Sequence, residues 1–222
     1  MARFARHSLI WLTPEGWRDA IDATSPSLRV ALDGWLANDW PAIVRRQDAD
    51  ATEEQVCAGI ALPPDASGNK PRIGIRIPSV QVRRVEAALE LARLIPRMPD
   101  AWRAPLSSLV RDAADQGIIF RVYGSAALQC LTGKPYMTAS SDLDLLFHPA
   151  TSAQLSAGLS LLANCAHAVP LDGEVVFPSG QAVSWKEWLQ AQSRVLVKDR
   201  RAVRLMKMND LLQTLEDAAC TC

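Results

Sequence analysis

The sequence predicts an α+β fold, in which helices and strands are interspersed along one chain. Residues 72–77 alternate polar or small residues with isoleucines at period two, as a half-buried strand does. Other stretches repeat apolar residues at helical spacing, as residues 151–163 do. The chain has 222 residues, of which 49% are hydrophobic and 22% charged. This composition is typical of a globular protein with a large core and excludes general disorder.

The N-terminal half is expected to contain both kinds of element. Thr13 and Pro14 have the pattern of a helix N-cap and a first-turn proline, and residues 48–54 are interpreted as a solvated acidic loop. Apolar runs and alternation predict strands at residues 8–12, 42–46 and 72–77, the second of them at a sheet edge. Helical spacing predicts helices that begin at Pro14 and that span residues 27–36 and 80–94.

A break near residue 100 is predicted to divide the chain. Pro96, Pro99 and Pro105 follow one another closely, and the residue before a proline is unfavourable in a helix. We therefore expect an N-terminal α+β region at residues 1–100 and a second region at residues 101–222, separated by a linker or a sharp corner.

The C-terminal half is expected to alternate helices with strands. Gly117 is placed as a helix stop, and Ser184 with Glu187 has the form of a capping box. Helices are predicted at residues 106–116, 126–131 and 151–163, and from Ser184 and Asn209. Strands are predicted at residues 118–123, 142–147 and 171–177, followed by a hairpin of residues 195–197 and 202–205.

Charge and cysteine content exclude several classes of protein. The 24 Lys and Arg residues balance 24 Asp and Glu residues, so no global field would hold the chain on nucleic acid or on an anionic membrane. No stretch is long and apolar enough for a membrane span or a signal core, which predicts a cytoplasmic protein. Five irregularly spaced cysteines fit neither a disulfide framework nor a zinc site, and Cys220 and Cys222 are interpreted as an incidental tail.

Two aspartates mark the start of an apolar strand. Asp142 and Asp144 are two residues apart, so both carboxylates leave one face of the predicted strand, with Cα atoms roughly 6.5 Å apart. Two acids on one face are costly to desolvate unless a cation or solvent meets them. Oxygen ligands of this kind suit Mg²⁺, which binds a few carboxylates together with substrate phosphates. The alternative is a solvated strand entry that binds nothing.

A glycine-serine turn between a strand and a short helix precedes these aspartates. Gly124 would let the backbone approach a ligand closely, the Ser125 hydroxyl can donate to a phosphoryl oxygen, and the helix start offers free N–H groups. Alone, such a sequence is also typical of a simple turn and N-cap. Followed by the two aspartates, it predicts a nucleotide held between a phosphate-binding turn and a metal.

A third acid is expected if the site holds two ions, because two aspartates do not usually bridge and anchor both. Asp172 and Glu174 alternate with apolar or small residues on the third predicted strand, so they share a face. The sequence does not distinguish between the two, and an exposed, solvated strand face is the alternative for either.

The order of these motifs resembles the nucleotidyltransferase superfamily of the DNA polymerase β type. Longer segments resemble a narrower family, the malonate decarboxylase holo-acyl carrier protein synthases or phosphoribosyl-dephospho-CoA transferases. The likeness covers most of the chain except residues 48–58 and the tail after Asn209. The similar segments are residues 6–12, 39–46, 71–75, 121–133, 138–147 and 172–177.

The resemblance implies a polymerase β-like core with a mixed sheet. An N-terminal α+β region is expected to pack against this core, and the sequence does not say whether that region binds the carrier or the donor. It implies transfer of the prosthetic group from 2'-(5''-triphosphoribosyl)-3'-dephospho-CoA to a serine of the apo acyl carrier protein subunit of malonate decarboxylase, with release of pyrophosphate. Asp142 and Asp144 would then be catalytic and hold two Mg²⁺ ions. Asp172 or Glu174 would hold the ion nearest the serine and help to take its proton.

The same resemblance gives the phosphate-binding residues their roles. Gly124 and Ser125 would seat the departing β and γ phosphates. Basic residues are enriched in residues 70–97, which contain seven Lys and Arg and two acids, and in residues 191–210, which contain six and two. Such patches suit either an acidic carrier protein or the phosphates of the ligand, and solvated surface is the alternative for most of these side chains. Within them we expect Arg72, Arg76 and Lys198 to bind substrate. About sixteen residues separate Ser125 from Asp142, which is longer than in minimal members of the superfamily.

Two other functions remain compatible with these motifs. The first is another nucleotidyltransferase that adenylylates a small molecule or a protein. The second is a catalytically inactive relative that serves as a nucleotide-binding module. Intact Asp142 and Asp144 argue against the inactive module.

Overall fold

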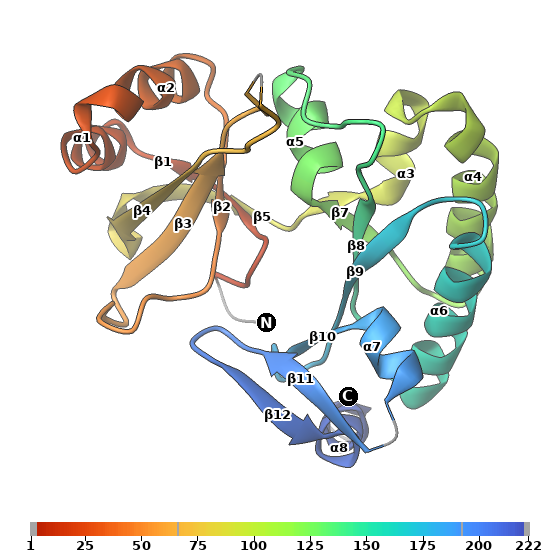
Figure 1. Cartoon of the computed structure of the whole chain (residues 1–222). Helices are drawn as coiled ribbons and strands as arrows, with labels where there is room; N and C mark the ends of the chain where they lie inside the picture. The colour runs from red at the N-terminus through yellow and green to blue at the C-terminus, as the bar shows by residue number, and fades with distance from the viewer. Residues whose placement is uncertain (1–3, 66, 192, 220–222) are drawn as a thin grey trace. The chain divides into compact units, whose positions relative to one another are not determined.

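The computed structural model describes residues 4–65, 67–191 and 193–219, which form two compact units (Figure 1). The N-terminal unit contains the residues up to Ala88 together with the short segment Leu131–Tyr136. The C-terminal unit contains Leu89–Cys130 and the residues from Met137 onward. Both units combine helices with a β-sheet, which confirms the α+β class.

The boundary between the units precedes the proline-rich stretch at which we expected it. The one-turn helix η2 (Ile95–Arg97) joins α3 (Leu91–Leu94) to α4 (Asp100–Ala114) within the C-terminal unit. Leu94 and Met98 are buried in the same core as residues of α4. The prolines therefore form a sharp corner inside this unit, and the units divide between Ala88 and Leu89.

The N-terminal unit is built on a five-stranded antiparallel sheet. Its strand order is β4-β3-β2-β1-β5, and β4 alternates exposed and buried residues as its period-two sequence predicts. Thr13 caps α1 by accepting a hydrogen bond from the Gly16 backbone N–H. The strands are β1 (Leu9–Leu12), β2 (Ala42–Val44), β3 (Gln55–Ala61), β4 (Arg72–Pro78) and β5 (Val82–Glu86), and the helices are α1 (Pro14–Asp22), α2 (Pro26–Ala37) and the single turn η1 (Ser79–Gln81).

Two predictions for this half are wrong. Residues 80–94 do not form one helix, because β5 pairs with β1 along its length, and β6 (Leu89–Glu90) and α3 follow it. The apolar spacing of Val82 and Val85 fits a helix, but pairing with a strand near the start of the chain overrides it. The second predicted strand, β2, is not at an edge, since it lies between β1 and β3. Strand β3 was not predicted from the sequence.

The C-terminal unit is built on a seven-stranded mixed sheet. Its order is β12-β11-β10-β9-β8-β7-β6, and only β8 and β9 run parallel, joined by the crossover helix α6. Helices α4 and α6 cover one face of this sheet (Figure 1), where Gly158 of α6 lies against the Phe147 ring. Besides β6, α3, η2 and α4, the elements are β7 (Arg121–Tyr123), α5 (Gly124–Thr132), β8 (Leu143–Phe147), α6 (Ser152–Cys165), β9 (Leu171–Val176), β10 (Ala182–Ser184), α7 (Trp185–Gln190), β11 (Arg194–Lys198), β12 (Val203–Lys207) and α8 (Met208–Ala219).

The elements of this half differ from the predictions mainly at their ends. Helix α4 begins at Asp100 and passes through Pro105, which removes one backbone hydrogen bond near the helix start. The capping box is wrong: Ser184 makes no side-chain cap, and Glu187 accepts a hydrogen bond from the Leu196 N–H instead. The predicted hairpin is confirmed by the antiparallel pairing of β11 and β12. None of the described helices combines the length and apolar character that a bilayer crossing requires.

Candidate functional site

The predicted glycine turn lies directly against one of the predicted aspartates. Gly124 follows β7 and begins α5 with a φ of +68°, a conformation that disfavours any residue with a side chain. A Cβ atom on Gly124 would lie 2.1 Å from Oδ2 of Asp144. Only glycine therefore lets the start of α5 pack this closely against the carboxylate.

The acids of two neighbouring strands lie side by side. Asp144 of β8 is the cross-strand partner of Tyr123 on β7 and of Asp172 on β9. Cross-strand partners share a face of the sheet. The opposite face carries Leu143, Leu145 and other apolar residues of the core beneath α4 and α6. The polar face therefore presents the half-buried side chains of Asp144 and Asp172.

Asp142 lies just outside the line of cross-strand partners formed by Tyr123, Asp144 and Asp172. Strand β8 begins at Leu143, so Asp142 precedes the strand and is exposed to solvent. One residue, Leu143, separates it from Asp144, which keeps both carboxylates at the same end of β8. Ser125 is half-buried in the first turn of α5, directly after Gly124. The Gly-Ser turn and the Asp-x-Asp segment therefore meet at one end of the β7–β8 pair, as the motif order predicts.

A glycine that the sequence analysis did not single out brings β8 and β9 together. Gly173 has a φ of +137°, and a Cβ atom there would lie 1.9 Å from the backbone oxygen of Leu145. Its backbone N–H donates to Oδ1 of Asp172 at 2.8 Å, which fixes that carboxylate. The sequence signal was a glycine between two acids on a predicted strand. Gly173 thus holds β9 against β8 where Asp172 faces Asp144.

The two candidates for the third acid lie in different surroundings. Glu174 is buried, with 4% of its surface exposed, and its Oε1 accepts a hydrogen bond from Nζ of Lys198 at 2.9 Å. A buried carboxylate requires such a partner because desolvation disfavours its charge. Asp172 is half-exposed, and its nearest cation is Lys186, whose Nζ lies 4.0 Å from Oδ1. Lys186 was not among the predicted residues.

The predicted arginines lie in the other unit. Arg72 and Arg76 share the exposed face of β4 in the N-terminal unit. Arg76 pairs with Asp48 and Asp50 at 3.0 and 2.8 Å, so the acidic loop is held by arginine rather than simply solvated. Hydrogen bonds from Arg45, followed by those from Arg76, hold the pKa of Asp48 well below its usual range, against an opposing effect of burial. The charge of Arg76 is therefore neutralised within its own unit.

A metal would need ligands from outside the chain. Within the described ranges, no group of three or more His, Cys, Asp or Glu side chains is arranged around one position. The adjacent carboxylates of Asp144 and Asp172, with Asp142 at the strand start, do fit Mg²⁺, which uses one or two carboxylates and completes its shell with water and phosphate oxygens. Cys220 and Cys222 lie outside the described residues.

Comparison with known proteins matches both halves of the chain to one family. Residues 5–88 match the phosphoribosyl-dephospho-CoA transferase MdcG N-terminal domain, and residues 89–209 match the C-terminal domain of the same name. A phosphoribosyl-dephospho-CoA transferase of Xanthomonas campestris pv. campestris (strain 8004) is 37% identical over 203 residues, which cover 90% of this chain and 93% of the relative.

More distant relatives carry the same name. A protein of Bradyrhizobium diazoefficiens is 32% identical over 213 residues, covering 93% of this chain and 92% of the relative. A protein of Pseudomonas putida is 29% identical over 203 residues, with 90% and 92% covered. No solved structure matches the chain. Because family models and relatives above 30% identity span nearly the whole sequence, the chain belongs to the phosphoribosyl-dephospho-CoA transferase family and is a transferase, as its motifs predicted.

Proposed function

We propose that this chain transfers the phosphoribosyl-dephospho-CoA group from 2'-(5''-triphosphoribosyl)-3'-dephospho-CoA to a serine of the apo acyl carrier protein subunit of malonate decarboxylase, in the cytoplasm. The names of its relatives support a donor derived from dephospho-CoA. The observation that carries the proposal is the packing of the Gly124 turn against Asp144, with Asp172 on the adjacent strand. This arrangement joins a phosphate-binding helix start to a pair of carboxylates.

The reaction is an in-line displacement at the α-phosphorus of the donor. The serine oxygen forms the new P–O bond, the bond to the β-phosphate oxygen breaks, and pyrophosphate leaves with the released electron pair. The serine proton passes to a nearby base. We assign this role to Asp172, whose half-exposed carboxylate is oriented by the Gly173 N–H.

Donor phosphates would occupy the start of α5. The backbone N–H groups after Gly124 and the Ser125 hydroxyl would donate to the β and γ phosphates, which stabilises the charge that develops on the leaving group. Lys198, oriented by Glu174, adds a positive charge on the same face of the sheet. Glu174 then positions Lys198, and Asp172 is the third acid of the site.

Asp144 and Asp172, with Asp142 at the start of β8, would supply the carboxylates for Mg²⁺, and water and donor phosphate oxygens would complete its shell. The ion would supply charge neutralisation for the attacking and leaving oxygens. The element order supports a nucleotidyltransferase core of the polymerase β type, with β7 ending at the Gly-Ser turn, β8 carrying the aspartates and β9 carrying the third acid. Arg72 remains a candidate for donor binding by the N-terminal unit, because it is exposed on β4.

Mass spectrometry of the carrier protein tests the proposal. The apo carrier is incubated with the full chain, donor and Mg²⁺, and transfer adds the mass of the phosphoribosyl-dephospho-CoA group to one serine. A parallel reaction with ATP in place of the donor distinguishes an adenylylating enzyme. An unmodified carrier in the presence of the donor, or an adenylylated product with ATP, would overturn the proposed function.

A further inference from the structure

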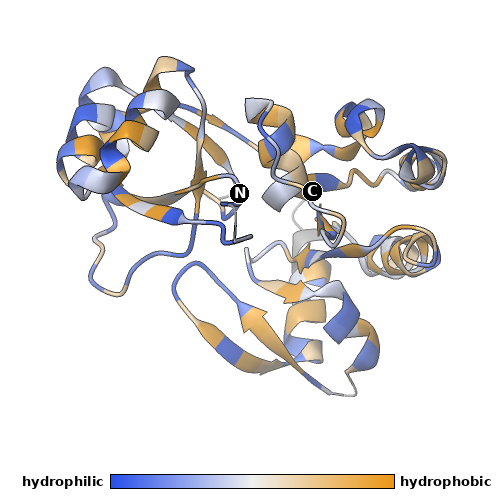
Figure 2. Cartoon of the chain, turned by 45° about the horizontal axis from the view of Figure 1, so that its top comes forward, coloured by the Kyte–Doolittle hydropathy of each residue, from blue (hydrophilic) through white to orange (hydrophobic). Residues whose placement is uncertain are grey.

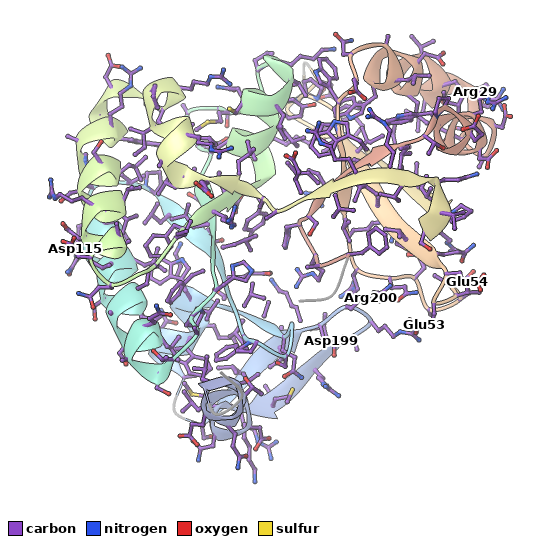
Figure 3. The ribbon with its side chains drawn as sticks, turned by 180° about the vertical axis from the view of Figure 1, so that it is seen from behind. Arg29, Glu53, Glu54, Asp115, Asp199 and Arg200 are labelled. Atoms are coloured by element: carbon purple, nitrogen blue, oxygen red, sulfur yellow. The ribbon has the colours of Figure 1, made fainter. Side chains whose placement is uncertain are left out.

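We propose that the outward face of the β11–β12 hairpin is the docking surface for an acidic acceptor protein. The inference rests on the proposed function, which requires a macromolecular acceptor. The hairpin forms one edge of the seven-stranded sheet. Asp199 and Arg200 mark its turn (Figure 3).

The hairpin has one face in the core and one face outward. Val195 and Val197 are fully buried and pack in the core that also contains Leu211 and Leu215 of α8. Both strands carry apolar as well as hydrophilic residues (Figure 2). Cross-strand partners share a face, so the outward face consists of three pairs: Arg194 with Lys207, Leu196 with Leu205, and Lys198 with Val203.

The centre of this face is apolar and exposed. Leu196, Val203 and Leu205 have exposed fractions of 42%, 41% and 58%. Leu196 lies opposite Leu205, and Val203 is two residues from Leu205 on the same side of β12, so the three side chains are contiguous. Single exposed apolar residues are common, but a contiguous group on a flat sheet face is typical of an interaction site.

Cations flank this apolar centre. Arg194 and Lys207 are exposed at one end and pair with no carboxylate among the residues that the structure describes, and Lys198 lies at the other end. Residues 194–207 contain six Lys and Arg residues and one acid, Asp199. Asp199 is used in the turn, where its Oδ1 accepts hydrogen bonds from the N–H groups of Arg201 and Ala202. The complementary partner therefore has an apolar centre with carboxylates beside it, at the end that faces Arg194 and Lys207.

The position of the face favours the acceptor as its occupant. Lys198 belongs to this face and binds Glu174, and Glu174 lies on the same side of the sheet as Asp144 and Asp172. A protein bound on the hairpin would thus reach the edge of the candidate site. Residues 194–207 contain no Trp, Tyr or Phe, the side chains that anchor proteins at membrane interfaces. The apolar centre also argues against nucleic acid, whose interfaces are strongly polar.

Two double variants of the full-length chain test the surface. Leu196→Ser with Leu205→Ser removes the apolar centre, and Arg194→Glu with Lys207→Glu reverses the charges at one end. None of these side chains lies in the core, and none belongs to the candidate active site. We expect each pair to raise the KM for the apo acyl carrier protein about tenfold or more, while the KM for the donor and kcat at saturating carrier stay within about twofold.

A matched control separates docking from general charge effects. Arg93→Glu with Arg111→Glu makes the same change in net charge at cations of the same unit with 75% and 69% exposed side chains, and it should leave the carrier KM unchanged. The inference is overturned if neither hairpin variant changes the carrier KM, or if the control changes it equally.

Direct binding keeps this test independent of the proposed reaction. Fluorescence anisotropy measures the affinity of labelled apo carrier for the wild-type chain and for both hairpin variants. If the wild type transfers nothing, the proposed function fails, but weakened carrier binding by the variants still supports the docking surface. Absent or unaltered carrier binding overturns it. Hairpin-dependent binding to phosphatidylserine vesicles, or a dimer that the variants dissolve, would overturn it by assigning the face to a membrane or to a second copy.

Discussion

Replacing Gly124 with alanine would separate the phosphate-binding turn from the carboxylate beside it. The new Cβ would lie 2.1 Å from Oδ2 of Asp144, where an ordinary contact is at least 3.4 Å, so the carboxylate must move by about 1 Å or more. The positive φ of Gly124 adds about 1–2 kcal/mol of strain. A displacement of about 1 Å at reacting groups can lower a rate about 10²-fold. We therefore expect kcat to fall by about that factor.

Pyrophosphate release and carrier mass measure the activity, and thermal unfolding measures the strain. A loss of about 1–2 kcal/mol should lower Tm by about 2–8 °C in a chain of this size. Gly133→Ala is the matched control, because Gly133 has a φ of +69° and no atom of the described residues lies within 4 Å of the place that its Cβ would take. It should lower Tm similarly and leave kcat intact. A Gly124→Ala enzyme with wild-type kcat, or an equal loss of kcat in Gly133→Ala, would show that catalysis does not depend on the close contact between Gly124 and Asp144.

Further substitutions probe other parts of the structure. Asp142→Asn or Asp144→Asn should abolish pyrophosphate release without changing thermal unfolding, and near-normal turnover in either would contradict a metal-binding role. Lys198→Met should lower the unfolding free energy by about 1–3 kcal/mol because it leaves the Glu174 carboxylate buried without its cation. Adding Glu174→Gln to this variant should restore part of the loss. Equal denaturation curves for the single and double variants would argue against a stabilising Lys198–Glu174 pair. The lowered pKa of Asp48 contributes stability that is present above about pH 4 and is lost as the pH falls further. Asp48→Asn should therefore make Tm less dependent on pH on the acid side. An unchanged pH dependence of Tm in this variant would count against the contact between Asp48 and Arg45. Burial raises the pKa of Tyr136 to about 12, so stability should fall as the pH rises from about 10 to 12, and Tyr136→Phe should remove this alkaline loss; a loss that persists in the variant would locate its cause elsewhere.

Local sequence patterns predicted the elements that keep their own periodicity in the fold. They failed for segments whose secondary structure is decided by pairing with a distant strand. Strand β4 follows its alternation over its whole length because one of its faces is buried. Residues 80–94 resemble a helix because four apolar residues have helical spacing: Val82, Val85, Leu89 and Ala92. In the structure, however, residues 82–86 form β5 and pair with β1. Strand β3 was missed because the glycine and alanines in its sequence give only a weak β signal.

The centre of the candidate site could be predicted from the sequence because its parts are close in the chain. Asp144 lies on β8, Gly124 and Ser125 directly follow β7, and these two strands are consecutive in the chain and paired in the sheet, so their pairing alone brings the residues together. The sequence could not show that Glu174 is buried beside Lys198 while Asp172 is half-exposed, since this difference depends on where β11 places Lys198. Arg76 was expected to bind substrate because the sequence does not reveal that Asp48 and Asp50 lie beside it.

Because the segment Leu131–Tyr136 belongs to the N-terminal unit, both units are built from more than one segment of the chain. The Tyr136 hydroxyl donates to the Ala61 carbonyl at 2.8 Å, and Lys134 lies 5.2 Å from the centre of the Trp40 ring. The polypeptide thus leaves α5, contributes six residues to the N-terminal unit and returns shortly before Asp142. A single cut after Ala88 would separate those six residues from the rest of the N-terminal unit. Exchange of the chain at that point would transfer only part of the N-terminal unit.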